Sequence, residues 1–287
     1  MADQHIDEVT GVETTGHEWD GIRELNNPLP RWWVIVFYAC IVWALAYTIF
    51  YPAWPLIHGA TPGLLGYSTR GELASDLVAA KADQAAIIGR IASLPIEEVA
   101  ADRELNQFAL AAGAAAFKVN CTPCHGSGAE GGKGYPNLND DDWLWGGSLQ
   151  AIQTTVLHGI RALDDPDTRV SEMPAFGEML EPQQVREVAA YVVSLTGESA
   201  HREMVEPGKQ VFAENCAACH GEDGRGNREL GAPNLADAIW LKVDGEAGIA
   251  RQVVSPKHGV MPAWGARLGE TTVKELSIYV HSLGGGE

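Results

Sequence analysis

The sequence predicts an all-α protein in which one membrane-spanning helix near the N-terminus is followed by two similar helical domains. Three observations predict this class. Residues 32–57 contain no charged side chain, residues 58–107 carry apolar side chains at helical spacing, and residues 108–287 hold two copies of one pattern. A chain of 287 residues is long enough for two ordinary domains of this kind.

Residues 1–30 form a short acidic segment with seven carboxylates, too small to build a core, so they predict a tail or a docking segment. The whole chain has a formal net charge of −18. A nucleic-acid partner is excluded by this charge, because phosphate binding needs a basic face. The charge favours a basic partner, although many acidic proteins have none.

Residues 31–57 predict a transmembrane helix, because about 20 apolar residues suffice to cross the hydrocarbon core of a bilayer. Prolines in its last turn are expected to loosen only that turn. A cleaved signal peptide would have a shorter apolar run nearer to the N-terminus. Aromatic side chains stand at both ends, where interfacial aromatics belong: Trp32, Trp33, Tyr51 and Trp54.

Residues 58–107 are rich in alanine and predict a helical linker that holds the rest of the chain away from the membrane.

The remaining chain is an internal repeat, predicted to form one domain over 108–198 and another over 203–287. "FKVNCTPCHGSG" matches "FAENCAACHGED", "MPAFG" matches "MPAWG", and "VREVAAYVVSL" matches "VKELSIYVHSL". The first copy has twelve additional residues, 161–172, whose charge and proline content predict a surface loop.

Each repeat contains a Cys-X-X-Cys-His block, which is typical of covalent haem attachment. The two thiols can form thioether links to the vinyl groups of a haem, while the histidine coordinates the iron. A zinc site would need about four ligands from one small domain, and a redox dithiol would be expected near a βαβ pattern. The sequence therefore predicts two covalently attached haem c groups, bound by Cys121, Cys124 and His125 and by Cys216, Cys219 and His220.

Met173 and Met261 are the predicted sixth ligands of the two irons, because a thioether is a soft ligand and the following proline leaves each methionine on a loop. An interchange, in which each repeat lends its methionine to the iron of the other, stays open. An iron with both axial positions filled has no site for a substrate. The sequence therefore predicts an electron carrier with no catalytic residue of its own.

Several other residues allow two interpretations. His158 and His258 are expected to be ordinary loop histidines, although they could bind a haem propionate or compete as ligands. Arg161 is a candidate partner of a propionate or a solvated surface charge. Met179 and Met204 lack the Met-Pro setting and are expected to pack. The walls of the haem crevices are expected to include Trp143, Phe176, Trp240 and Trp264.

Residues 108–287 resemble tandem class I cytochrome c domains. The segment "WDGIRELNNPLPRWW" at 19–33, which runs directly into one hydrophobic span, is more specific. With the two haem blocks, it resembles subunit III of the cbb3-type cytochrome c oxidases over the whole chain.

The resemblance implies a subunit of the bacterial inner membrane, with a cytoplasmic N-terminal segment and a periplasmic diheme domain. It implies that c-type cytochromes donate electrons, which pass to a monohaem cytochrome c subunit and to a catalytic subunit with haem b and copper. There oxygen is reduced to water and protons are pumped. By the same resemblance His125 and Met173 bind one iron, and His220 and Met261 bind the other. Some members have two spans, so contacts known from that form are in doubt here.

Two other functions compete with this one. The chain could be the cytochrome subunit of a membrane dehydrogenase or another reductase, which would co-purify with a quinone-type or flavin cofactor. It could also be an enzyme such as a diheme peroxidase, or a gas sensor. These need an iron that can open, so carbon monoxide would change the spectrum of the reduced protein.

Overall fold

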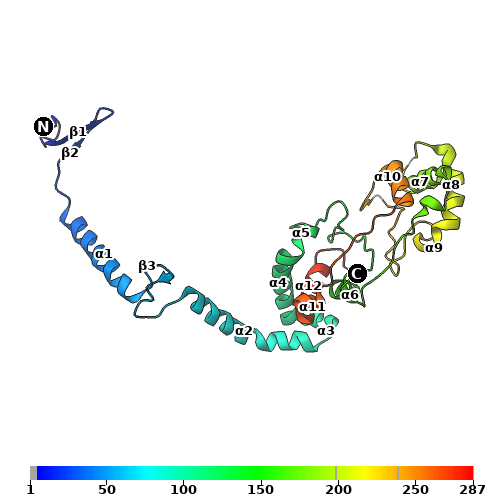
Figure 1. The fold of residues 1–287 in the computed structure, drawn as a ribbon, viewed down its shortest axis with the longest axis horizontal. Coiled ribbons are helices and arrows are strands. Elements are labelled where there is room, and N and C mark those ends of the chain that lie inside the picture. Colours follow the sequence, from blue (N-terminus) through cyan, green and yellow to red (C-terminus); the bar gives the residue numbers. More distant parts are fainter. Residues whose placement is uncertain (1–4, 198, 238, 287) are drawn as a thin grey trace. The chain divides into compact units, whose positions relative to one another are not determined.

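The protein is described by a computed structural model that covers residues 5–197, 199–237 and 239–286. The fold is mostly helical, as predicted, with one long apolar helix near the N-terminus (Figure 1). The chain divides into two compact units, residues 1–83 and residues 84–287, which are described in turn.

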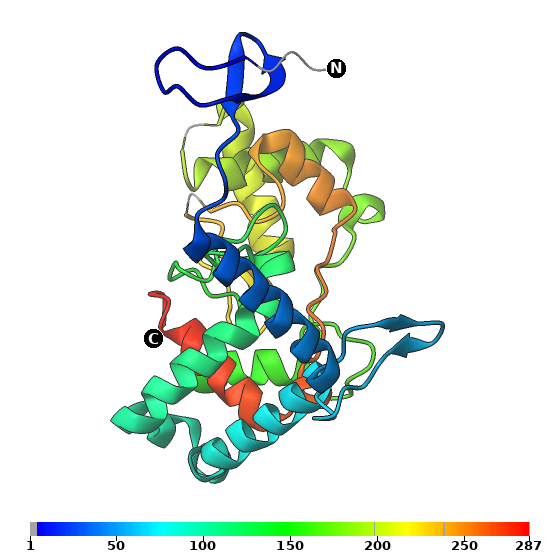
Figure 2. The ribbon, with the colours of Figure 1, turned by 90° about the vertical axis from the view of Figure 1, so that its left-hand side faces the viewer.

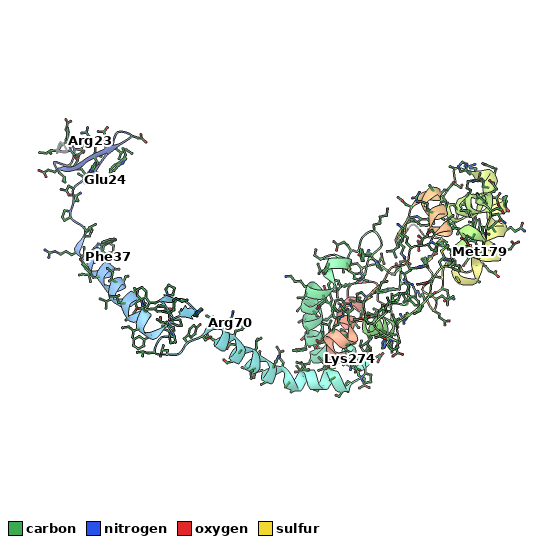
Figure 3. All side chains as sticks on the ribbon, in the orientation of Figure 1. Arg23, Glu24, Phe37, Arg70, Met179 and Lys274 are labelled. Carbon is green, nitrogen blue, oxygen red and sulfur yellow. The ribbon has the colours of Figure 1, made fainter. Side chains whose placement is uncertain are left out.

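In the first unit, α1 (Arg31–Phe50) is the helix long and apolar enough to cross a membrane. Its side chains, such as Phe37 in Figure 3, lie on the outside and none is buried, which suits a helix surrounded by lipid. The helix ends seven residues before the predicted limit at residue 57. Tyr51 is extended (φ −115°, ψ 160°), because the proline at position 52 disfavours helical backbone in the residue before it.

Two short hairpins flank α1, and the sequence analysis predicted neither. Strands β1 (Thr14–Trp19) and β2 (Ile22–Leu25) are antiparallel, and their tight turn has positive φ at Asp20 (50°) and Gly21 (83°). Asp-Gly is the preferred sequence for such a turn, so this signal was available in the segment predicted to be a tail. Strands β3 (Pro55–Leu56) and β4 (Gly59–Ala60) form the second hairpin.

Helix α2 (Thr69–Ser93) belongs to the stretch predicted as a helical linker and continues from the first unit into the second. Its C-terminal end is fixed by Lys274, labelled in Figure 3, whose Nζ donates to the backbone oxygens of Ile91 (2.8 Å), Ala92 (3.1 Å) and Leu94 (2.7 Å). These are the carbonyl groups that a helix end leaves without an internal partner. Lys274 therefore ties the end of the linker to the C-terminal part of the chain.

The second unit contains two helical bodies. The first body consists of α4 (Arg103–Asn120), α5 (Thr122–His125), α6 (Leu149–His158), α11 (Gly265–Leu268) and α12 (Glu270–His281), with α3 (Ile96–Ala101) beside it. The second body consists of η1 (Phe176–Glu178), α7 (Pro182–Ser194), α8 (Arg202–Asn215), α9 (Ala217–His220) and α10 (Gly245–Val254).

The bodies do not coincide with the sequence repeats, because the closing helix of each repeat packs on the opening helix of the other. Helix α12 lies against α4, and α7 lies against α8 (Figures 1 and 2). The aromatic pairs show the same exchange. The Phe117 and Tyr279 ring centroids are 5.4 Å apart, and those of Phe212 and Tyr191 are 5.2 Å apart. The predicted boundaries 108–198 and 203–287 thus describe repeats of sequence, and each repeat contributes to both bodies.

A glycine allows each of these helix pairs to approach closely. A Cβ atom at Gly113 of α4 would overlap the backbone oxygen of Glu275 in α12. A Cβ atom at Gly208 of α8 would overlap the backbone oxygen of Glu187 in α7 in the same way. Both helix pairs therefore cross in the same way, with a glycine of one helix against the backbone of the other.

Each body has its own apolar core. The core of the first body includes Phe117, Ile152, Val156, Val273, Leu276 and Val280, and the core of the second includes Phe176, Val188, Tyr191, Val211, Phe212, Ile249 and Val253. A third cluster joins α2 and α3 to α4 and α12 through Ile91, Ile96, Val99, Leu105, Ala109 and Ile278.

Candidate functional site

The two Cys-X-X-Cys-His blocks have the same local structure. In the first, the amides of Cys124 (3.1 Å) and His125 (2.9 Å) donate to the backbone oxygen of Cys121, which makes one helical turn. The second block, from Cys216 to His220, repeats both bonds at the same distances. Both turns stop at a glycine with positive φ, 82° in the first and 79° in the second. The turn places the two thiols of a block near each other and beside the imidazole.

Both block histidines are oriented through Nδ1. Nδ1 of His125 donates to the backbone oxygen of Pro136 (3.1 Å), and Nδ1 of His220 donates to that of Pro233 (3.1 Å). Because an oxygen can only accept, each ring has its proton on Nδ1 and a lone pair on Nε2. Burial lowers the pKa of both imidazoles, so both are neutral at physiological pH, which is the form that binds a metal.

Pro136 and Pro233 are functional residues that the sequence analysis did not assign. They belong to the matching elements "YPNL" and "APNL", whose repetition was the available signal. The acceptor is a backbone carbonyl oxygen, which every residue has. The residue type at these positions therefore does not predict the hydrogen bond to the histidine.

The block thiols do not have the properties of a redox pair or of a zinc site. Burial raises the pKa of Cys121 and of Cys216 to about 11, whereas a reactive dithiol needs a lowered pKa. The two blocks also contribute to different cores, and among the described residues their thiols do not gather into a group of metal ligands. The buried, protonated thiols of Cys121 and Cys216 fit covalent attachment to a porphyrin.

A cavity of about 100 Å³ lies in the first body beside the first block. Cys121 and His125 line one part of it, and Met261 lines it as well. The walls are mainly apolar or aromatic and include Phe117, Leu138, Trp143, Trp145, Ile152, Val156, Ile160, Trp264, Leu276 and Val280.

Met261 reaches this cavity from the second repeat. Its amide donates to the backbone oxygen of Ile160 (3.0 Å), and its oxygen accepts from the amide of Ile160 (2.9 Å). The amide of Trp264 donates to the backbone oxygen of Val156 (3.0 Å) and fixes the following turn. Gly159 is needed beside this pairing, because a Cβ atom there would overlap the backbone oxygen of Met261.

Met173, from the first repeat, lies in the second body. Its side chain packs against the core that contains Cys216, Phe212 and the partly buried Trp240. Its amide donates to Nε2 of His258 (3.1 Å). His258 therefore holds the methionine loop, a more specific role than the ordinary loop histidine that was expected.

The family resemblance implied His125 with Met173 and His220 with Met261, and the structure places these side chains differently. It brings Met261 to the cavity of His125, and Met173 to the core around the second block. The reason is the exchange of the closing helices, since each methionine loop immediately precedes its closing helix along the chain. The side chains therefore lie as the interchange that the sequence left open would require.

The remaining predicted residues are distributed as follows. The expected wall aromatics lie at the first cavity (Trp143 and Trp264) or in the second core (Phe176 and Trp240). His158 pairs through Nδ1 with the carboxylate of Asp165 (3.2 Å). Met179, expected to pack, is instead 60% exposed (Figure 3).

Arg161, for which the sequence left two readings, is half-buried. It donates to the backbone oxygens of Gly259 (2.7 Å) and Ser171 (2.6 Å). These bonds connect the additional loop of the first repeat to the methionine loop of the second. They make Arg161 part of the crossing rather than a solvated charge.

Comparison with known proteins agrees with this architecture. Residues 11–58 match the N-terminal domain of cytochrome oxidase-cbb3, FixP, and residues 108–192 and 203–280 match cytochrome C oxidase, cbb3-type, subunit III. The cbb3-type cytochrome c oxidase subunit FixP of Rhizobium meliloti is 63% identical over 289 residues, with both chains covered completely. The subunit CcoP of Cereibacter sphaeroides is 51% identical over 276 residues, which is 96% of this chain and 95% of that protein.

These matches confirm the resemblance drawn from the "NPLPRWW" segment and the two haem blocks. They cover the membrane helix and both repeats, so they extend beyond the short haem-attachment motif. The chain belongs to the family of cbb3-type cytochrome c oxidase subunit III proteins.

Proposed function

We propose that this chain is a diheme electron relay, which accepts electrons from c-type cytochromes and passes them to the monohaem and catalytic subunits of a proton-pumping cbb3-type oxidase. Membership of the family supports an electron-transfer role in this oxidase rather than in a dehydrogenase. The observation that carries the proposal is the convergence of the Cys121 thiol, an oriented neutral imidazole and a methionine on one apolar cavity.

Two haem c groups per chain follow from the equivalence of the two blocks. A bound haem c supplies a one-electron redox couple. Cys121 and Cys124 would hold the first porphyrin and Cys216 and Cys219 the second. The axial pairs would be His125 with Met261 and His220 with Met173, which is the crosswise arrangement of the side chains. Residue pairs of this kind leave no position for a substrate.

Exclusion of water is a second function of the protein around each site. Trp143, Trp264 and the neighbouring apolar side chains surround the first cavity, and Phe176 and Trp240 belong to the second core. An apolar surrounding and a methionine ligand both raise the reduction potential of haem iron. High potentials suit an electron carrier close to the oxygen-reducing end of a respiratory chain.

We propose that α1 anchors the chain in the bacterial inner membrane, with its N-terminal segment in the cytoplasm and the second unit in the periplasm. The length and composition of α1 support the anchor. The periplasmic placement rests on the haem blocks, because haem is attached covalently outside the cytoplasmic membrane in such bacteria. A protease added to intact spheroplasts should cleave the second unit and spare residues 1–30.

Gentle detergent extraction followed by haem analysis tests the proposal. We expect two covalently attached haems per chain, together with a second c-type subunit and a subunit that contains haem b and copper. The reduced chain on its own should not respond to carbon monoxide. A chain that co-purifies with a flavin or quinone-type cofactor, or that contains zinc in place of haem, would contradict the proposal.

A further inference from the structure

The additional loop of the first repeat, residues 161–172, places Arg169 beside the first cavity. The backbone oxygen of Arg169 accepts from the amide of Arg161 (2.9 Å), and Arg169 pairs in parallel with Ile160. Ile160 also pairs with Met261, on its other side. Arg169 is therefore fixed next to the segment that carries Met261 into the cavity.

The guanidinium of Arg169 lies against the wall of this cavity. Its Nη1 donates to Oγ1 of Thr155 (2.6 Å) and to the backbone oxygen of Trp145 (3.3 Å), and its Cζ lies 5.3 Å from the centroid of the Trp145 ring. Thr155 and Trp145 both line the cavity. The charge is thus held at the edge of the site by hydrogen bonds and by the aromatic face.

The charge of Arg169 has no counterion in the described part of the chain. Arg90, in contrast, pairs with Asp102 (2.8 Å) and Glu104 (2.7 Å). A guanidinium stays charged at all physiological pH values, and its partial burial costs free energy unless an anion compensates it. Burial lowers the pKa of Arg169 accordingly. Nη1 makes the hydrogen bonds, and within the described residues Nη2 has no partner, so donors remain for an anion.

The cavity itself disfavours negative charge without such a cation. Asp142 lines it, and burial and the neighbouring Asp237 raise the pKa of this carboxyl to about 6. A porphyrin of haem c introduces two propionates, so it needs positive charge at the edge where they lie.

We infer, on the basis of the proposed function, that Arg169 binds a propionate of the first haem and raises the reduction potential of its iron. A nearby positive charge favours reduction, because the added electron makes the iron less positive, and no bond forms or breaks. The second repeat passes directly from "HGV" to Met261 and has no residue equivalent to Arg169. Arg169 therefore adds a positive charge at the first haem that the second repeat does not supply at the matching position.

Redox titration of the full chain tests the inference. In Arg169→Gln the equilibrium constant for reduction of the first haem should fall between threefold and tenfold, where tenfold is about 59 mV for one electron. The second haem should not change. A chain with Cys216 and Cys219 replaced by alanine retains only the first haem. Its titration therefore identifies which redox transition of the full chain belongs to that haem. Arg186→Gln removes an exposed arginine from α7 and is the matched control for charge.

Arg169→Lys keeps the charge and should retain most of the potential. If Arg169→Gln fails to bind the first haem, the potential of the first haem in Arg169→Lys tests the inference instead. An unchanged first wave in Arg169→Gln, equal shifts of both waves, or the same loss in Arg169→Lys would overturn the inference. Fewer than two haems in the unaltered chain would overturn the proposed function, so the two failures are distinguishable.

Discussion

Each haem-block histidine is prepared for metal binding by one backbone oxygen, from Pro136 or Pro233. At the scale of single residues, the candidate side chains of the site could be predicted from the sequence because thiols, imidazoles and thioethers are distinctive chemical types. It did not identify the two prolines, whose contribution comes from the backbone. The contact of His258 with the methionine loop and the position of Arg169 became visible only in contacts between segments far apart in the chain.

Glu275 is a buried carboxyl group in α12 and is only 7% exposed. Burial raises its pKa from the ordinary value to about 7. Between the ordinary pKa and pH 7, the unfolded chain has ionised Glu275 while the folded chain keeps it protonated. The free energy of unfolding therefore falls as the pH rises through this window, and is constant above it.

Glu275→Gln removes this pH dependence, because the amide cannot ionise. The variant should be more stable than the parent by about 1–3 kcal/mol at pH 8 and should gain nothing at pH 4. Denaturant unfolding at both pH values measures the difference. Glu270→Gln, an exposed position in the same helix, controls for the charge. A gain of equal size at both pH values would contradict this account.

At the scale of helices, the crossings of α4 with α12 and of α7 with α8 depend on glycine. Gly113→Ala should lower the free energy of unfolding by about 1–3 kcal/mol, because the added methyl group overlaps the backbone of α12. Gly89→Ala in α2 is the matched control, since a Cβ atom there meets no atom within 4 Å. It should be neutral or stabilise the chain by up to about 1 kcal/mol.

Thermal or denaturant unfolding of the haem-loaded protein compares the two variants. If Gly113→Ala is as stable as Gly89→Ala, then α4 and α12 do not make the close contact described here.

The exchange of closing helices could not be predicted from the sequence. The repeats carry the same residue types at the crossing positions, so Phe117 can face either Tyr191 or Tyr279 with nearly equal local energy. The path of the connecting segments, including residues 161–172, determines which closing helix packs on which opening helix. A sequence pattern does not give that path. The helices themselves follow from periodicity. The β1–β2 hairpin could also have been predicted, from its Asp-Gly turn.

At the scale of the molecule, charge is the property most relevant to partners. Of the 38 carboxylates of the chain, 31 lie beyond residue 57. Of the 20 Lys and Arg residues, 18 lie there. This excess of negative charge should attract a basic electron donor and accelerate encounter. Salt screens the attraction, with a Debye length of about 8 Å at physiological ionic strength.

The rate of electron transfer from a basic c-type cytochrome should therefore fall as ionic strength rises. Stopped-flow measurement with a range of salt concentrations tests this, and a small uncharged reductant is the control, because its rate should stay constant. A flat profile with the protein donor would remove the steering argument.

The central claim is that each haem takes its histidine from one repeat and its methionine from the other. The most direct measurement uses the full chain with Cys121 and Cys124 replaced by alanine, which retains only the haem at His220. In this chain, Met173→Ala should abolish the methionine–iron charge-transfer band of the oxidised protein, whereas Met261→Ala should leave it unchanged. Loss of the band in Met261→Ala with retention in Met173→Ala would contradict the crosswise arrangement.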